Sequence, residues 1–440
     1  MKMKRFLSLA LAAVLSLSTA SVAFAEGDEK FAIGNTKYAT LQEAVDKVKE
    51  GETIKLLEST KGDGVVVKSG SKFTIDFNGC TYTVNENTVG SPNTKTNGFQ
   101  LLKDSEITMQ NGTIKSGESA KILIQNYSNL TLRDLTLDAR EGDACQYVLS
   151  NNYGNTVIEG NTNIYASPKN SVGVAFDVYY FLSDAYKDGV SIKIDTTGEI
   201  VGTVEYGVST QGKDAAAEKA KLNVVNGTID GAITTPGLDD DNKTGINVTG
   251  GLFTDASWNN DEYTENAEVA AVLMDGGEEA AYHFGKASDE IDATNYDGVN
   301  LKKAPEGSNI KVVGEEVEVK NETGKALTVN GAKVPVDGNV VVNRAPREDN
   351  GGDYFGNEKW AKVKREIAAA EEGDTIKVSA TGLPWFPSSV ARALKGHDIT
   401  LEIRKNGTTY SVNGEKIGAI EKIWYEFDQL EEKLLTAEAK

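Results

Sequence analysis

Cysteine and histidine are almost absent from this chain. Its 440 residues include two of each. Two cysteines allow at most one disulfide, so the fold cannot depend on a disulfide framework. Cys80 and Cys145 fall at different positions of the repeat described below, and we expect two small buried thiols. Both histidines, His283 and His397, lie outside that repeat, which disfavours a Ser-His or zinc site on it.

Positive charge is scarce as well. The chain has 46 Lys and Arg against 66 Asp and Glu, a formal net charge of −20. Binding to phosphate groups depends on Lys and Arg, so we expect neither nucleic acid nor anionic lipid as a partner. The acidic balance is typical of a soluble extracellular protein.

Long apolar runs are confined to the N-terminus. Basic residues at positions 2, 4 and 5 precede an apolar run over residues 6–17, and Ala23-Phe24-Ala25 has the small-x-small pattern of a cleavage site. The run is too short for a membrane span. Residues 1–25 are therefore predicted to be a signal peptide, with no membrane insertion after cleavage. We see no sorting signal or apolar tail, so we expect a secreted or non-covalently surface-associated protein.

A repeat fills the first half of the chain. Each copy has a short strand of alternating apolar residues, an Asn-Gly-like turn and a second short strand, as in Phe73–Cys80 and Ile107–Ile114. The copies begin at Phe73, Ile107, Leu130, Val157, Ile192, Leu222 and Ile246. Periods in the twenties to thirties are typical of a parallel β-solenoid, whereas a hairpin meander repeats about every 10 residues.

The repeat predicts a mainly β fold, a right-handed parallel β-helix of about seven coils with three short strands each. Phe73 should stack under Ile107 and then Leu130, because alternate side chains point inward. Two Asn-Tyr-x-Asn segments, Asn126–Asn129 and Asn152–Asn155, precede successive coils, and their Asn side chains should stack along the ladder.

Further units flank these coils. We predict a β-helix domain over 26–285, capped by a helix near 40–49 and closed by an irregular segment up to His283. A small β module over 286–343 and a polar linker over 344–353 should follow, and then an α+β domain over 354–440. That last domain begins with a copy of the cap, because Tyr38–Leu56 aligns without gaps on Trp360–Val378. A helix at Pro387–Leu394, a hairpin and a final amphipathic helix through Ile423 and Leu434 complete it.

The cap, the coils and the Gly250–Ser257 ending resemble the parallel β-helix repeat surface proteins of gut Firmicutes, within the pectate-lyase-like fold group. The C-terminal domain is similar to one that recurs in clostridial surface proteins, carried by Trp385–Gly396, Asp398–Leu401 and Tyr410–Gly414. The resemblance implies a surface or secreted protein, but it does not imply one activity, since this fold hosts many.

Aromatic residues are the candidate ligand-binding side chains. Tyr179, Tyr180, Phe181 and Tyr186 lie in what reads as the longest insert between coils, and aromatic rings bind sugar faces and partner proteins. A folded insert that covers its own aromatics is the alternative. Trp385 and Phe386 in the C-terminal domain are a second candidate, or part of its core.

Two acidic clusters offer the remaining chemistry. In the first cluster an Arg lies beside an Asp, so it could supply the base and the calcium ligands of a lyase. A solvated turn with salt bridges explains the same residues equally well. The residues of this cluster are Arg133, Asp134, Asp138, Arg140 and Asp143. The second cluster, Asp239, Asp240 and Asp241, invites a calcium site but lacks the remaining features of an EF-hand loop. We therefore assign no cofactor and leave calcium open.

Taken together, these features favour an exported, non-enzymatic, monomeric binding or adhesion protein, with a glycan or an extracellular or cell-wall protein as ligand. A structural component of the envelope and a polysaccharide lyase or glycoside hydrolase are the alternatives.

Overall fold

The computed structural model describes residues 29–85, 87–91, 94–180, 186–209, 216–236, 238, 245–314, 316–342, 357–380, 383, 385–405, 407–422 and 424–435. The predicted signal peptide and linker lie outside these residues.

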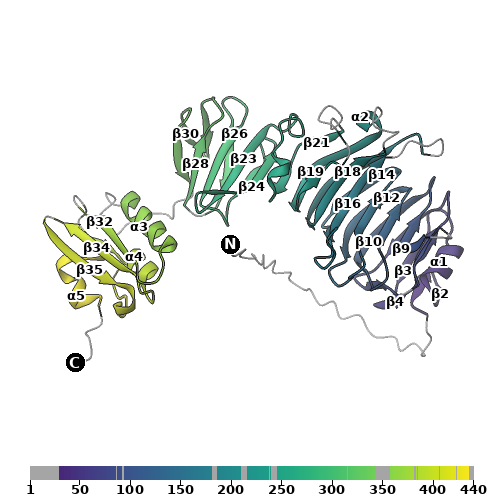
Figure 1. Ribbon diagram of the computed structural model, residues 1–440, viewed down its shortest axis with the longest axis horizontal. Helices are drawn as coiled ribbons and strands as arrows, with labels where there is room; N and C mark the ends of the chain where they lie inside the picture. The colour runs from purple at the N-terminus through teal and green to yellow at the C-terminus, as the bar shows by residue number, and fades with distance from the viewer. Residues whose placement is uncertain are drawn as a thin grey trace.

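The chain is mainly β, and two large parallel sheets form a β-helix-like solenoid (Figure 1). The chain alternates between the sheets, so each return adds a strand beside the previous one. The solenoid strands of sheet A are β3 (Thr53–Leu56), β4 (Thr60–Gly62), β6 (Lys72–Asp76), β7 (Thr81–Val84), β10 (Glu106–Lys115), β12 (Asn129–Asp138), β14 (Gly154–Gly160), β15 (Asn163–Tyr165), β17 (Val190–Val201), β19 (Ala220–Asp230), β21 (Ile246–Val248) and β22 (Gly251–Phe253). Those of sheet B are β5 (Val65–Val67), β9 (Thr94–Leu101), β11 (Ile122–Asn126), β13 (Tyr147–Asn151), β16 (Val174–Tyr180), β18 (Thr203–Val208) and β20 (Ile233–Thr234), with β8 (Val89–Ser91) antiparallel on β9.

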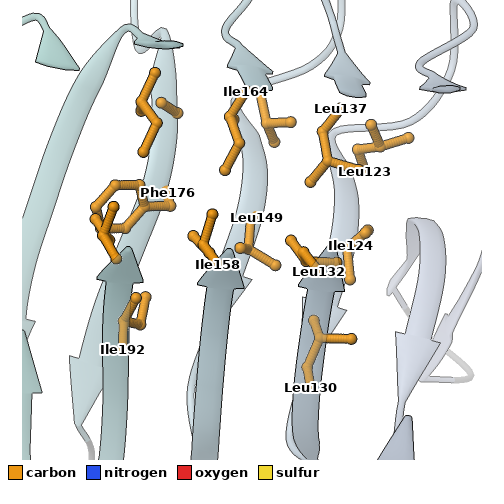
Figure 2. Close-up of a cluster of buried hydrophobic side chains, with 14 of the residues drawn as sticks. Leu123, Ile124, Leu130, Leu132, Leu137, Leu149, Ile158, Ile164, Phe176 and Ile192 are labelled. Atoms are coloured by element: carbon orange, nitrogen blue, oxygen red, sulfur yellow. The ribbon is translucent and has the colours of Figure 1, made fainter. Parts of the chain in front are cut away.

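The inward stacks follow the predicted register. Phe73 pairs with Ile107 and Ile107 with Leu130, each one strand further along sheet A. These side chains are buried and face the inward side chains of sheet B, as Leu132 and Ile124 do in Figure 2. Alternation thus turns a linear repeat into one continuous apolar core.

The predicted three strands are present in some coils, such as β6, β7 and β9 or β14, β15 and β16, but not in all of them. In β10 and β12 the strand runs through the Asn-Gly-like turn without a break. Asn78, Asn111 and Asp134 sit there with φ of 53°, 60° and 50°. Asn and Asp tolerate this left-handed conformation, so the turn bends sheet A. The strand continues through the bend at Asn111 and Asp134 and is interrupted at Asn78, between β6 and β7.

The N-terminal end of the solenoid is covered by a hairpin and a helix. Strand β1 (Phe31–Ile33) pairs antiparallel with both β2 (Thr36–Tyr38) and β3. Helix α1 (Leu41–Lys47) begins with a capping box between Thr40 and Glu43, and it buries Leu41, Ala44 and Val45. The cap that the amphipathic pattern predicts is therefore present.

The C-terminal end of the solenoid is more regular than we predicted. A short 3₁₀ helix, η3 (Ala256–Trp258), is followed by β23 (Val269–Asp275) and β24 (Glu278–Gly285), and β24 pairs antiparallel with β22. Trp258 is fully buried against Phe253, with ring centroids 4.8 Å apart.

Sheet A continues beyond the parallel coils around a second core. Its further strands are β26 (Gly298–Lys303), β28 (Val317–Asn321) and β31 (Asn339–Val342). A small sheet packs with them, made of β25 (Glu290–Asp292), β27 (Asn309–Val313), β29 (Leu327–Val329) and β30 (Ala332–Val334).

The C-terminal residues have a core of their own. The elements are α3 (Asn357–Ala369), β32 (Thr375–Ser379), β33 (Phe386–Pro387), α4 (Ser388–Leu394), β34 (Thr400–Lys405), β35 (Thr408–Asn413), η4 (Gly414–Lys416), β36 (Trp424–Tyr425), η5 (Phe427–Gln429) and α5 (Leu430–Lys433). The predicted final amphipathic helix is wrong: Tyr425 pairs with Phe386 between two strands, and the helical turns after it are short.

The sequence copy at an offset of 322 residues is also a structural copy. The Lys49 amide donates to Glu52 Oε2 at 2.8 Å, and the Glu371 amide donates to Asp374 Oδ2 at 2.8 Å. Each turn leads into a strand that starts a parallel pair, β3 with β6 and β32 with β34.

The inward stack supplies a test of the fold. Leu132→Ala removes buried methyl groups between neighbouring coils, and we expect the free energy of unfolding to fall by about 2–5 kcal/mol. The outward neighbour Thr131 is only half-buried, so Thr131→Ala should change that free energy by about 0.5 kcal/mol. Chemical denaturation of both variants measures the difference; equal effects would contradict the assigned faces.

Candidate ligand-binding pocket

The turns from sheet B to sheet A stack on one another. The Tyr127 amide donates to the Leu101 carbonyl at 2.9 Å, the Asn152 amide to the Asn126 carbonyl at 3.0 Å, and the Gly154 amide to the Gly189 carbonyl at 3.1 Å. Each turn is therefore fixed by the turn before or after it.

A pair of buried asparagines holds two of these turns. Asn126 Nδ2 donates to Asn151 Oδ1 at 3.2 Å, and Asn126 Oδ1 accepts from the Ser128 amide at 2.9 Å. The hydroxyl of Thr156 donates to Asn151 Oδ1 at 2.7 Å. Buried amides of this kind are stable only when their donors and acceptors are paired, so the network fixes the conformation of both turns.

Glycine allows the turns to approach closely. Gly154 has a φ of +82°, and a Cβ there would lie 2.4 Å from the Ser128 carbonyl oxygen. Gly189 has a φ of +97°, and its Cβ would lie 2.3 Å from the Lys219 carbonyl oxygen. No other residue fits either position without moving the neighbouring turn.

The predicted stacking of the two Asn-Tyr-x-Asn segments is confirmed for their last residues. Asn129 Oδ1 accepts hydrogen bonds from the Asn155 amide at 3.0 Å and from Asn155 Nδ2 at 3.3 Å. Ser191 Oγ continues the column by donating to Asn155 Oδ1 at 2.6 Å. The first residues stack differently, because the side-chain partner of Asn126 is Asn151.

Three tyrosines cluster beside this polar column. The Tyr186 ring lies 5.1 Å from the Tyr127 ring and 5.3 Å from the Tyr153 ring, between centroids. Tyr153 donates its hydroxyl to Asp188 at 2.8 Å. That hydrogen bond, with burial, raises the pKa of Tyr153 to about 12, and burial near Tyr186 and Asp177 raises the pKa of Tyr127 to about 12. Both phenols are therefore neutral donors at physiological pH.

A pocket of about 350 Å³ opens along these turns. Tyr127 and Tyr153 line it together with the polar column of Asn129, Asn155 and Ser191. Charged residues of both signs complete the wall, namely Asp104, Asp188, Glu218, Lys219 and Lys221. Two tyrosines, amides, hydroxyls and charged groups thus line one largely polar cavity.

A buried carboxyl group lies on sheet B, near enough to Tyr127 to contribute to the raised pKa of that phenol. Asp177 accepts from Ser150 Oγ at 2.8 Å and from the Asn151 amide at 2.5 Å. Burial raises the pKa of Asp177 to about 8, since it outweighs both hydrogen bonds and the nearby Glu205 adds to the increase. Glu205, one strand further, has a pKa raised by burial and accepts a hydrogen bond from Tyr147.

The predicted aromatic insert is largely a strand. Tyr179 and Tyr180 belong to β16, which is paired on both sides within sheet B. Tyr180 is 1% exposed and packs in the core, so its ring cannot contact a ligand. Tyr179 is half-buried, and Phe181 lies outside the described residues. Of this predicted group, Tyr186 is the residue that contacts the pocket tyrosines.

In the second predicted aromatic pair, Phe386 belongs to the core and Trp385 is only half-buried. Phe386 is fully buried, 5.5 Å from the Trp360 ring. Trp385 is half-buried and lies 5.6 Å from the Trp424 ring. Alternation along β33 and β36 explains the split, because Phe386 and Tyr425 both face the core.

The residues of the predicted lyase cluster are held in separate contacts. Arg133 Nε donates to Glu159 at 2.7 Å, and Asp134 Oδ1 accepts from the Asn161 amide at 2.8 Å. Asp143 pairs with Lys169 at 2.7 Å. The cluster is therefore a set of ion pairs and a turn along neighbouring coils, and only Asp138 and Arg140 contact each other.

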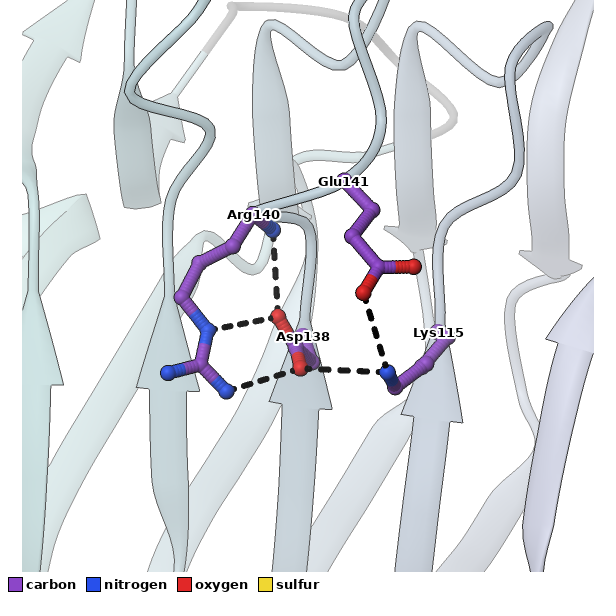
Figure 3. Close-up of polar contacts among 4 residues, drawn as sticks. All are labelled: Lys115, Asp138, Arg140 and Glu141. Atoms are coloured by element: carbon purple, nitrogen blue, oxygen red, sulfur yellow. Dashed lines mark hydrogen bonds and ion pairs between the residues drawn. The ribbon is translucent and has the colours of Figure 1, made fainter.

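Asp138 and Arg140 form a two-bond pair (Figure 3). Arg140 Nε and Nη2 each donate to the Asp138 carboxylate at 2.9 Å, and Lys115 lies 3.9 Å from the same group. Lys115 also pairs with Glu141 at 3.6 Å. Burial opposes ionisation of Asp138, but its bonds to Arg140 outweigh burial and hold its pKa below the ordinary value.

Some of the predicted site residues lie outside the part of the chain that the structure describes. Asp239, Asp240 and Asp241 fall outside the described residues. Within the described ranges, no three or more His, Cys, Asp or Glu side chains are grouped as a metal ion requires. No described helix is long and apolar enough to cross a membrane. Cys80 and Cys145 are free thiols; Cys145 is buried and Cys80 half-buried.

Sequence reasoning missed Tyr127 and Tyr153, although the signal was available. Both tyrosines occupy the second position of the Asn-Tyr-x-Asn segments, 26 residues apart. Residues at equivalent positions of successive coils stack, so the repeat itself indicates two neighbouring rings at one edge of the solenoid.

Asp177 gives the protein a specific pH dependence. The folded protein holds the Asp177 proton up to about pH 8, whereas the unfolded chain releases it near the ordinary aspartate pKa of 3.8. Stability from this group is therefore complete below about pH 4 and is lost as the pH rises towards 8. Asp177→Asn should remove this loss, which we expect to be on the order of a few kcal/mol.

The measurement is the free energy of unfolding at several pH values from 5 to 9. Asp143→Asn is the matched control, because Asp143 is exposed and contacts Lys169 at the surface. It should keep the pH dependence of the unmodified protein. A pH profile of Asp177→Asn that coincides with that of Asp143→Asn would show that Asp177 is ionised in the folded state.

Comparisons of the chain with known proteins identified no relative. No family model matches the chain, and no match was found among the curated proteins or the solved structures.

Proposed function

We propose that this chain is an exported, non-enzymatic binding protein that recognises a glycan in the pocket at the turns between sheets B and A. The observation that carries the proposal is that Tyr127 and Tyr153, each in contact with Tyr186, line this pocket beside a column of amide and hydroxyl groups.

The chemistry of the pocket matches that of a sugar. One face of a pyranose ring consists of C–H groups, which pack on the flat face of an aromatic ring. Its edge carries hydroxyls that donate and accept, as do the amides of Asn129 and Asn155 and the hydroxyl of Ser191. Because the pocket wall carries charges of both signs, it does not favour a ligand with a net charge.

The proposal includes a finer description of the fold. A right-handed parallel β-helix of about seven coils, of the pectate-lyase-like group, accounts for the alternation of the chain between two parallel ladders. Crossovers between parallel strands are right-handed in almost all proteins. Long ladders offer rigid turns on which a pocket is held without a disulfide.

Export and solubility complete the proposal. The pattern of the first 25 residues is typical of a cleaved signal peptide, and the acidic surface suits a monomer released from the cell or held non-covalently on it. The same charge opposes nucleic acid binding. Calcium and other cofactors play no part in the proposed recognition.

The test is a glycan array probed with the purified protein and three variants. Tyr153→Ala removes one pocket ring and should reduce binding to any recognised glycan about tenfold, because stacking on an aromatic ring contributes on the order of 1 kcal/mol and the lost contact exposes the neighbouring ring. Tyr153→Phe keeps the ring and should retain most of the binding.

The matched control is Tyr38→Ala, a half-buried tyrosine of β2 at the far N-terminal hairpin. It should leave binding unchanged, and all three variants should keep the melting temperature within a few degrees. If the Tyr153→Ala variant binds a glycan as well as the unmodified protein does, the site for that glycan lies outside this pocket. Capture of a protein ligand by the pocket, with no glycan bound, would replace the glycan with a protein partner.

A further inference from the structure

The pocket is elongated along the solenoid axis. Its residues come from five successive turns, which pair in register from Glu106 to Asn129 and from Asn155 through Ser191 to Lys221. Side-chain hydrogen bonds join Asn129 to Asn155 between these pairs. Neighbouring strands lie about 4.8 Å apart, so four steps extend the pocket over about 19 Å.

The walls repeat along the same direction. Tyr127 and Tyr153 are one coil apart, and Asn129 and Asn155 are one coil apart beside them. Each step of the pocket therefore offers a polar group, and two neighbouring steps also offer a ring. A ligand that repeats its own chemistry at a similar spacing makes the same contacts at successive steps.

The geometry points to a neutral linear oligosaccharide of about four sugars, lying along the solenoid axis with about one sugar per coil. This inference rests on the proposed function and specifies its ligand. A pyranose joined through opposite ends repeats at nearly the strand spacing. Successive sugars are turned over relative to one another, but each has C–H groups on both faces and hydroxyls at its edge, so every step of the pocket meets similar groups.

An extended peptide fits the pocket less well. Peptides bind to β proteins by adding a strand, which needs unpaired backbone groups at a sheet edge. In the turns that line the pocket, backbone groups already form hydrogen bonds between coils. The Asn129 amide donates to the Ser105 carbonyl, and the Gly154 amide donates to the Gly189 carbonyl. Recognition must therefore come from side chains, which suits a glycan.

A highly charged glycan is also disfavoured. Asp104, Asp188 and Glu218 oppose a polyanion, and Lys219 and Lys221 oppose a polycation. Tyr127 and Tyr153 keep their hydroxyl protons at physiological pH and add no charge. The polymer that meets all of these conditions is neutral.

The experiment measures affinity against ligand length. Isothermal titration of the purified protein uses two series of one to six sugars, cello-oligosaccharides and chito-oligosaccharides. In the series that fits, affinity should rise about threefold to tenfold per added sugar up to about four sugars and then stay level, because each ring adds one aromatic or polar step.

Two variants locate the ligand. Tyr153→Ala, in the middle of the pocket, should weaken ligands of every length. Lys221→Ala, at the last turn, should weaken only the longer ligands that reach it, and Tyr38→Ala should weaken none. Equal affinity for one sugar and for six would overturn the axial arrangement and leave the proposed function standing. Absence of binding in both series, with binding to other glycans on the array, would overturn the neutral linear ligand alone. Absence of binding to any glycan would overturn both.

Discussion

The hydrogen bonding between successive coils is the constraint on which the rest of this structure depends. A parallel ladder fixes each strand relative to the one before it, and the inward side chains then meet at every step. Burial along this stack supplies the stability that a framework of disulfides supplies in many small secreted domains. The turns must pack as closely as the strands, which is why Gly154 and Gly189 occupy positions with no room for a side chain.

The pairing of strands between coils was predictable from the sequence because it follows from the spacing of the repeat. The pairing of Phe73 with Ile107 and Leu130 follows from alternation alone, and Asn78, Asn111 and Asp134 mark the bend by their tolerance of a left-handed backbone. The sequence did not show in which coils the strand breaks at this bend, because a bend and a break between strands have the same local signature. The final helix was mistaken because spacing in a short apolar segment does not separate a strand from a helical turn.

The candidate pocket was only partly predictable. Tyr186 was identified as an aromatic residue beside the coils, but its partners depend on which turns stack, and the side chain of Asn126 pairs with Asn151. The burial of Tyr180 and the raised pKa of Asp177 arise from the crowding of neighbouring coils, which no single segment records. The repeated Asn-Tyr-x-Asn segment carried more information than its asparagines alone.

Both ends of sheet A's parallel ladder are finished by strands that run the other way, β1 against β3 and β24 against β22. Antiparallel pairs space their hydrogen bonds differently from parallel ones, so the parallel pattern of sheet A stops at these two strands. A solenoid with open ends is a template for indefinite end-to-end growth. The reversal of one strand at each end therefore interrupts the parallel ladder of sheet A, the pattern by which further coils of the same kind would be added.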